Sequence, residues 1–250
     1  MEIILFYNLL CAHLIADFWL QTDKIVAEKR KFGFQGKALY AHSLIVALLS
    51  YIFSGAFAFW SYAIVIFLSH AIIDFVKTRF KNILWPFVID QILHFVVIYC
   101  IAVWFIQNNS EWTQFPFISE QNVLKVPILI CACVFCTSPA NFLIREVLAK
   151  FRINTLMKKK EGANEEIPVG LQNAGALIGG LERLLVLAFV LIGNYEAAGL
   201  TIAAKTILRF RDDEGPRTEF VLVGTLLSFL IVLIVSIIVL LVAFDGLHLK

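Results

Sequence analysis

The chain has 250 residues, of which 60% are apolar and 16% charged, and its net charge is +2 at pH 7. Its mean hydropathy is +0.83, whereas soluble domains are roughly 45–50% apolar and about 25% charged. This composition excludes an ordinary soluble domain. No nucleic-acid partner is expected, although the net charge by itself says little.

Apolar stretches of about 20 residues, the length that crosses a bilayer, recur along the whole chain. We predict eight membrane helices, at residues 3–21, 38–55, 59–77, 85–106, 124–144, 171–193, 194–210 and 219–244. The seventh is short and carries Lys205 and Arg209, so seven crossings are the alternative. The predicted fold class is therefore all-α, a polytopic transmembrane helical bundle.

Basic residues alternate between the predicted loops. Eighteen of the 21 Lys and Arg residues lie in four alternate loops, around 24–37, 77–81, 145–160 and 205–217. Because cytoplasmic loops are enriched in Lys and Arg, these loops are predicted to be cytoplasmic and both termini to lie outside.

The chain divides into two membrane halves of different chemistry. Residues 1–106 form a predicted four-helix half rich in His and Asp, and residues 107–123 form an external loop. Residues 124–250 form the second half, which has a polar cytoplasmic linker at 154–170.

Three His/Asp pairs with a spacing of four residues mark the first half. Residues four apart share one face of a helix. The order reverses in the last pair, and that helix is predicted to run antiparallel to the other two, so the like groups would meet. The pairs are His13/Asp17, His70/Asp74 and Asp90/His94.

These six side chains and His42 are predicted to share one layer in the cytoplasmic half of the bilayer. A lone Asp inside a membrane costs about 2.5–3.5 kcal/mol, so three of them require partners, an ion or water. Imidazole and carboxylate ligands without thiolate suit a divalent transition metal, with Zn²⁺ and Mn²⁺ the first candidates. We predict a metal site at His13, Asp17, His42, His70, Asp74, Asp90 and His94.

A structural interpretation stays open beside the metal site. Each His/Asp pair is also explained by hydrogen bonds that join neighbouring helices. Gln21 and Gln91 lie near the same layer, where they would orient the ligands or simply link helices.

Charged residues also fall within the predicted helices of the second half. Arg183, Lys205 and Arg209 are candidates for holding an anionic head group. The alternative is that they form structural ion pairs, for example between Lys205 and Glu182.

The motifs resemble those of a bacterial inner-membrane family catalogued as domain of unknown function 3307. The residues that carry the resemblance are His13, Asp17, Phe18, Gln21, His42, His70, Asp74 and Lys77, with 179–183, 204–210 and 219–228 in the second half. The resemblance implies a multi-pass protein of the bacterial inner (plasma) membrane and no particular activity. The His/Asp helices are more loosely similar to membrane-bound metal-dependent hydrolases.

We therefore expect a metal-dependent hydrolase of a lipid-linked or amphiphilic substrate, such as a lipid phosphate, at the cytoplasmic leaflet. Asp17, Asp74 and Asp90 are the candidate catalytic carboxylates, and membrane lipid is the expected partner. A divalent-cation or proton-coupled transporter and a non-catalytic membrane assembly protein are the alternatives.

Overall fold

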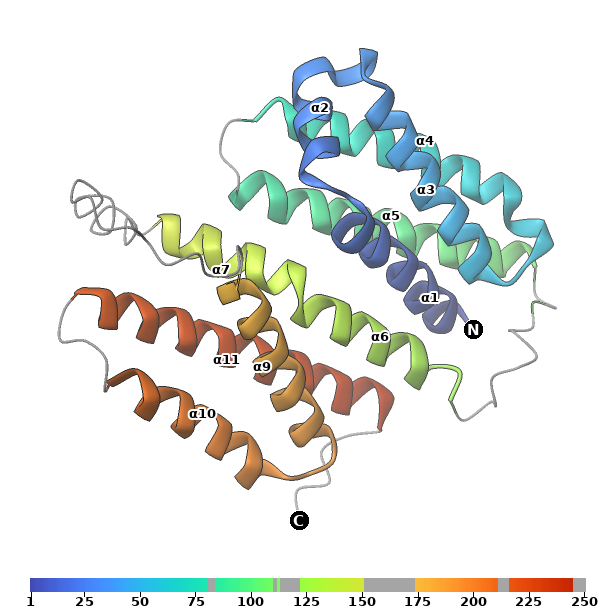
Figure 1. Ribbon diagram of the computed structural model, residues 1–250. Helices are drawn as coiled ribbons and strands as arrows, with labels where there is room; N and C mark the ends of the chain where they lie inside the picture. Colours follow the sequence, from blue (N-terminus) through green and yellow to red (C-terminus); the bar gives the residue numbers. More distant parts are fainter. Residues whose placement is uncertain (81–83, 110–111, 113–121, 151–173, 211–215, 245–250) are drawn as a thin grey trace. The chain divides into compact units, whose positions relative to one another are not determined.

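A computed structural model describes residues 1–80, 84–109, 112, 122–150, 174–210 and 216–244. Every regular element in these ranges is a helix (Figure 1). The chain forms two compact units, Met1–Val134 and Phe135–Lys250, which we describe separately. Most of the predicted external loop 107–123 and all of the linker 154–170 lie outside the described residues.

Six of the described helical segments are long and apolar enough to cross a membrane. They are Glu2–Leu20, Lys37–Ser54, Phe57–Thr78, Leu84–Asn108, Lys125–Ala149 and Leu222–Ala243. They correspond to six of the eight predicted spans. The remaining two predicted spans correspond to helices α9 (Ala174–Leu191) and α10 (Tyr195–Phe210).

Four helices of the first unit form a closed ring. They are α1 (Glu2–Ile15), α3 (Lys37–Ser54), α4 (Trp60–Thr78) and α5 (Leu84–Asn108). Helix α1 packs against α3 and α5, and α4 also packs against α3 and α5. Where α1 begins, Leu5, Phe59 and Phe105 belong to one buried apolar cluster.

A short helix that the sequence analysis treated as loop folds back onto this ring. Helix α2 (Asp23–Phe32) packs against α3 and α4. Gly33 lets the chain turn there, with a φ of 53° and no room for a Cβ, which would lie 3.0 Å from the Phe75 ring. Glu28 accepts a hydrogen bond from the Ala38 N–H at 3.2 Å, which joins α2 to the start of α3.

In the second unit, a helix break is bridged by a buried arginine. The predicted span 124–144 is divided into α6 (Lys125–Cys136) and α7 (Ser138–Lys150), because Pro139 lacks an N–H to continue the helix. Arg183 of α9 donates to the Cys136 carbonyl at 2.6 Å and to the Thr137 carbonyl at 3.2 Å.

The remaining Arg183 donors also meet protein oxygens. They reach Asn141 Oδ1 at 2.6 Å and Ser228 Oγ at 3.0 Å, the latter on α11 (Pro216–Ala243). Gly179 leaves space for this guanidinium, since a Cβ there would lie 3.3 Å from Nη1. One side chain thus connects α6, α7, α9 and α11.

We expect Arg183→Leu to destabilise the protein by about 2 kcal/mol or more, because it leaves several buried hydrogen-bond acceptors without a donor. The measurement is the midpoint of thermal unfolding in detergent. Arg145→Leu is the matched control: the Arg145 side chain is 68% exposed, so the change there should stay within about 0.5 kcal/mol. Equal midpoints for the two variants would contradict the bridging role.

Candidate metal centre

The seven predicted ligands meet inside the first unit. The structure brings them from four segments of the ring: α1 with its C-terminal extension, α3, α4 and α5. None of the seven is more than 8% exposed. They are His13, Asp17, His42, His70, Asp74, Asp90 and His94.

A π-helical turn presents the first carboxylate. Residues Ala16–Leu20 form a π-helix at the end of α1, and Asp17 lies in its first turn. Such turns hold an extra residue and often occur at functional sites. The sequence analysis predicted one continuous helix here, and no Gly or Pro marks the change of winding.

The four imidazoles lie in contact with one another. Their ring centroids are 4.3 Å (His70 to His94), 4.7 Å (His13 to His94), 5.0 Å (His42 to His70) and 5.6 Å (His13 to His70) apart. Such close packing is costly if the rings are charged, so neutral imidazoles, the form that binds metals, suit this cluster.

Three atoms of the cluster, on Asp17, His42 and His70, have the spacing of ligands around one ion, and an Asp74 oxygen lies near two of them. His42 Nε2 lies 3.0 Å from Asp17 Oδ1 and 3.9 Å from Asp74 Oδ2. His70 Nε2 lies 3.5 Å from each of the same two oxygens. A tetrahedral site with metal–ligand bonds of about 2.0–2.1 Å has ligand atoms about 3.3 Å apart. The two distances from Asp17 Oδ1 are close to that value, whereas Asp74 belongs to a separate ligand group with Asp90 and His94.

Several ring nitrogens in the cluster make no hydrogen bond within the described part of the chain. They are both nitrogens of His13 and of His70, Nδ1 of His42 and Nε2 of His94. Buried polar atoms left without a bond cost about 1–3 kcal/mol each. An ion bound by some of these nitrogens would offset that cost.

His94 is held in the tautomer that a metal ligand needs. Its Nδ1–H donates to the Asp90 carbonyl at 2.8 Å, which leaves the lone pair on Nε2. Within α5 the Asp90 carboxylate is 3.7 Å from Nδ1, so this predicted pair does not form a direct side-chain hydrogen bond.

The seven residues form three groups of possible metal ligands, and these groups share members. His13, His70 and His94 form one group of atoms close enough to hold an ion; Asp17, His42 and His70 form another; and Asp74, Asp90 and His94 form a third. All members of these groups are buried. The cluster therefore offers alternative sets of ligands for one ion, or enough ligands for two ions.

Two lysines complete the site, and the sequence analysis did not place them in it. Lys29 of α2, 4% exposed, forms an ion pair with Asp74 Oδ2. Lys77 forms one with Asp90 Oδ2 at 2.6 Å. Lys77 follows Asp74 by three residues and could have been found by helical spacing, whereas no local signal marks Lys29.

The two predicted glutamines occupy orienting positions. Gln21 Nε2 lies 3.0 Å from His42 Nε2. Gln91 Nε2 donates to Asp90 Oδ2 at 3.0 Å. Both therefore touch a candidate ligand directly.

The residues suggested for anion binding are separate from this cluster. The Arg183 donors described above all donate hydrogen bonds to protein oxygens, so this guanidinium links helices rather than binding an anion. Lys205 forms an ion pair with Glu182, the pairing raised as the alternative. The side chain of Arg209 lies outside the described residues.

Comparison with known proteins gives one match. Residues 5–124 match the family described as protein of unknown function (DUF3307). The match covers all seven candidate ligands and both lysines, but it does not reach 179–183, 204–210 or 219–228. No curated protein and no solved structure matches the chain, so the similarity to metal-dependent hydrolases has no support there.

We expect Lys29→Met to strengthen metal binding while weakening the metal-free protein. The Lys29 ammonium sits on the oxygen of Asp74 that an ion would use, so its loss removes a competitor and leaves the carboxylate unpaired. The measurement is thermal unfolding with chelator and with zinc, where tighter binding gives a larger zinc-induced shift.

Lys24→Met is the matched control for this prediction, since Lys24 is an exposed lysine of the same helix. It should behave as the wild type in both conditions. A zinc-induced shift in Lys29→Met no larger than in the control would contradict the competition between Lys29 and metal.

Proposed function

We propose that this chain, whose residues 5–124 match the DUF3307 family of proteins of unknown function, is a metal-dependent hydrolase embedded in the membrane. Its substrate would be an amphiphilic or lipid-linked ester or phosphoester. The spacing of three buried donor atoms, on Asp17, His42 and His70, carries the proposal, and an Asp74 oxygen lies within 3.9 Å of both imidazoles.

The donor set favours a borderline transition metal. Two imidazole nitrogens and two carboxylate oxygens suit Zn²⁺ or Mn²⁺, while the absence of an oxygen-only shell disfavours Ca²⁺ and Mg²⁺. With neutral imidazoles, three carboxylates and two ammonium groups leave one net negative charge in the cluster. A divalent cation is attracted to that charge.

A bound ion would supply a polarised carbonyl or phosphoryl oxygen and an acidic water. Asp90 is placed to accept the proton, since its Oδ1 is buried and makes no hydrogen bond to the described residues. Hydrolysis adds the hydroxyl of water to the acyl carbon or phosphorus. The bond to the leaving oxygen breaks, and that oxygen takes the proton, so water is the sole co-reactant.

A transporter for divalent cations or protons is the alternative. It needs a polar path through the end of the ring where α1 begins. That end holds Leu5, Phe59 and Phe105, each no more than 1% exposed. Asn8 and Ser50 are also buried in the ring, yet neither is a charge or an imidazole that would bind a cation in transit. The apolar packing at this end of the ring favours an enzyme over a transporter.

The proposed location is the bacterial inner membrane, with eight crossings, both termini outside and the metal centre near the cytoplasmic leaflet. The distribution of basic residues supports this orientation. Helix α9 has 18 residues, about 27 Å at 1.5 Å per residue, which is close to the thickness of the hydrocarbon core.

We expect purified protein to bind transition metal in near-stoichiometric amount, and Asp17→Asn and His42→Ala to lose it. Asp90→Asn should keep the metal and lower hydrolysis of a lipid phosphoester by roughly 10²–10⁴-fold, as for loss of a general base. The measurements are metal content by mass spectrometry and phosphate release.

Ser43→Ala is the matched control for metal content. Ser43 is a fully buried polar neighbour of His42 whose hydroxyl donates to the Leu39 carbonyl, and its loss should leave the metal bound. Wild-type protein that stays metal-free after reconstitution with zinc and manganese would refute the hydrolase. The polar layer would then be structural or proton-handling.

The eight-span topology is tested by cysteine labelling. In a protein whose five cysteines are replaced by alanine, Glu196→Cys should react with a membrane-impermeant maleimide added outside. Lys24→Cys should react only after permeabilisation. If Glu196→Cys also requires permeabilisation, α9 and α10 do not cross and six spans remain. A C-terminal reporter cannot distinguish these counts, since both are even.

A further inference from the structure

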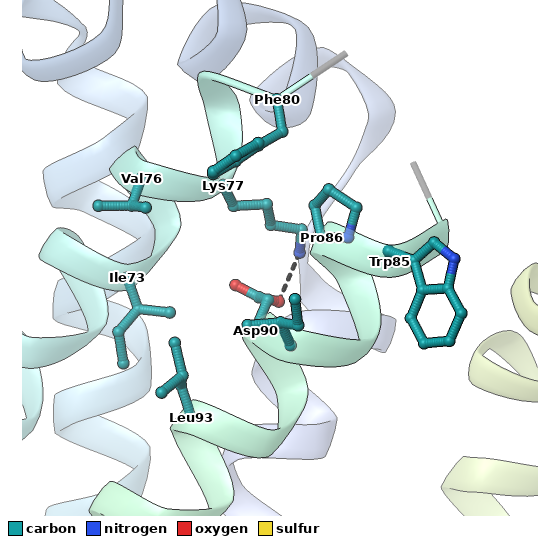
Figure 2. A pocket seen from close by; sticks show the side chains of 9 residues that line it. Ile73, Val76, Lys77, Phe80, Trp85, Pro86, Asp90 and Leu93 are labelled. Atoms are coloured by element: carbon teal, nitrogen blue, oxygen red, sulfur yellow. Dashed lines mark hydrogen bonds and ion pairs between the residues drawn. The ribbon is translucent and has the colours of Figure 1, made fainter. Parts of the chain in front are cut away.

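Helices α4 and α5 form an apolar groove that ends at the metal centre. The groove has a volume of about 360 Å³, within the range of about 300–1,000 Å³ for small-molecule sites. Figure 2 shows the side chains of both helices around it. Its apolar lining is Ile73 and Val76 from α4, Phe80 just after α4, and Trp85, Pro86, Ile89 and Leu93 from α5.

The charged residues among the described lining of the groove are Lys77 and Asp90, which form an ion pair (Figure 2). The Asp90 side chain is 1% exposed and the Lys77 side chain 30%. Asp90 belongs both to the groove and to the ligand group with Asp74 and His94. Asp90 therefore joins the groove to the candidate metal centre, and the Lys77 ammonium lies beside it.

The groove opens on a surface of the ring that suits hydrocarbon. Val76 and Ile89 are 47% and 54% exposed, on helices that are candidate membrane spans, and Phe80, which follows the first of these helices, is 59% exposed. In a bilayer such side chains meet lipid tails rather than water. A chain entering from the side would reach Lys77 without crossing the bilayer.

Charge complementarity identifies the head group. The cluster carries one net negative charge without an ion, so a divalent cation makes it net positive by one. A phosphomonoester head group would meet both that charge and the Lys77 ammonium. A neutral lipid would gain the apolar contacts alone.

We propose that this groove binds the hydrocarbon chain of a lipid phosphate, with Lys77 holding the phosphate beside the metal. The inference rests on the proposed function, because the metal supplies the net positive charge. It adds the route of entry, the binding groove and the head-group class.

The test is photo-crosslinking in phosphatidylcholine vesicles with zinc-loaded full-length protein. The probe is phosphatidic acid with a diazirine in one acyl chain, and a diacylglycerol with the same chain is the uncharged comparison. We expect phosphatidic acid to label the groove in preference to diacylglycerol. Ile73→Trp and Leu93→Trp, which fill the groove, should lower that labelling roughly tenfold, or about 1.4 kcal/mol.

Ile72→Trp and Ile92→Trp are the matched controls. They make the same substitution one residue away, at positions 55% and 54% exposed that do not line the groove. Both should keep the labelling. Labelling that is spread evenly over lipid-facing residues would contradict the groove as the binding site. Labelling that is unchanged in Ile73→Trp and Leu93→Trp would contradict it too.

Metal content measured on the same samples separates the two proposals. Stoichiometric metal with unspecific labelling refutes the groove and leaves the metal centre standing. Specific groove labelling in a protein that retains no metal supports lipid binding and refutes the hydrolase. Lys77→Gln should abolish the preference for phosphatidic acid, and an unchanged preference would overturn the role of Lys77.

Discussion

The organisation of the first unit depends on the burial of three carboxylates in an apolar ring. Each would cost about 2.5–3.5 kcal/mol if left alone in a membrane. Asp17 is compensated by imidazoles, whereas Asp74 and Asp90 each pair with a lysine. The fold of α2 follows from the same requirement. Gly33 and the contact between Glu28 and Ala38 return this short helix to the ring, where Lys29 reaches Asp74.

The second unit meets the related problem of a buried cation in a different way. Arg183 has four hydrogen bonds to neutral oxygens, two of them carbonyls beside the helix break at Thr137. These oxygens stabilise the positive charge of the guanidinium. In return, the arginine donates hydrogen bonds to backbone carbonyls that lose their helical partners at the break. An intramembrane charge is therefore not by itself a sign of a ligand. What sets the first unit apart is that several of its ring nitrogens make no hydrogen bond to the part of the chain that the structure describes.

Helical periodicity explains which features could be predicted from the sequence. The spacing of four residues places His13 with Asp17 and His70 with Asp74, and the reversed order of Asp90 and His94 matches an antiparallel helix. Six of the eight predicted spans are confirmed as candidate membrane helices. Lys29, the π-turn at Asp17 and the bridging role of Arg183 were missed, because each depends on contacts between residues distant in sequence. Pro139 did signal the break after Cys136, but a long apolar stretch hid it.

Lys29 links helix α2 to the chemistry of the site. Its ammonium and a metal ion would compete for Asp74 Oδ2. The ion pair that joins α2 to Asp74 would therefore be present in the metal-free form and lost or weakened in the metal-bound form. With Lys29 on Asp74 the cluster has nearly balanced charge, which makes the metal-free fold tolerable in lipid. With a divalent ion bound the cluster gains positive charge, which favours an anionic substrate. The two lysines that stabilise the metal-free cluster therefore also contribute to the net charge of the metal-bound cluster, to which a substrate would bind.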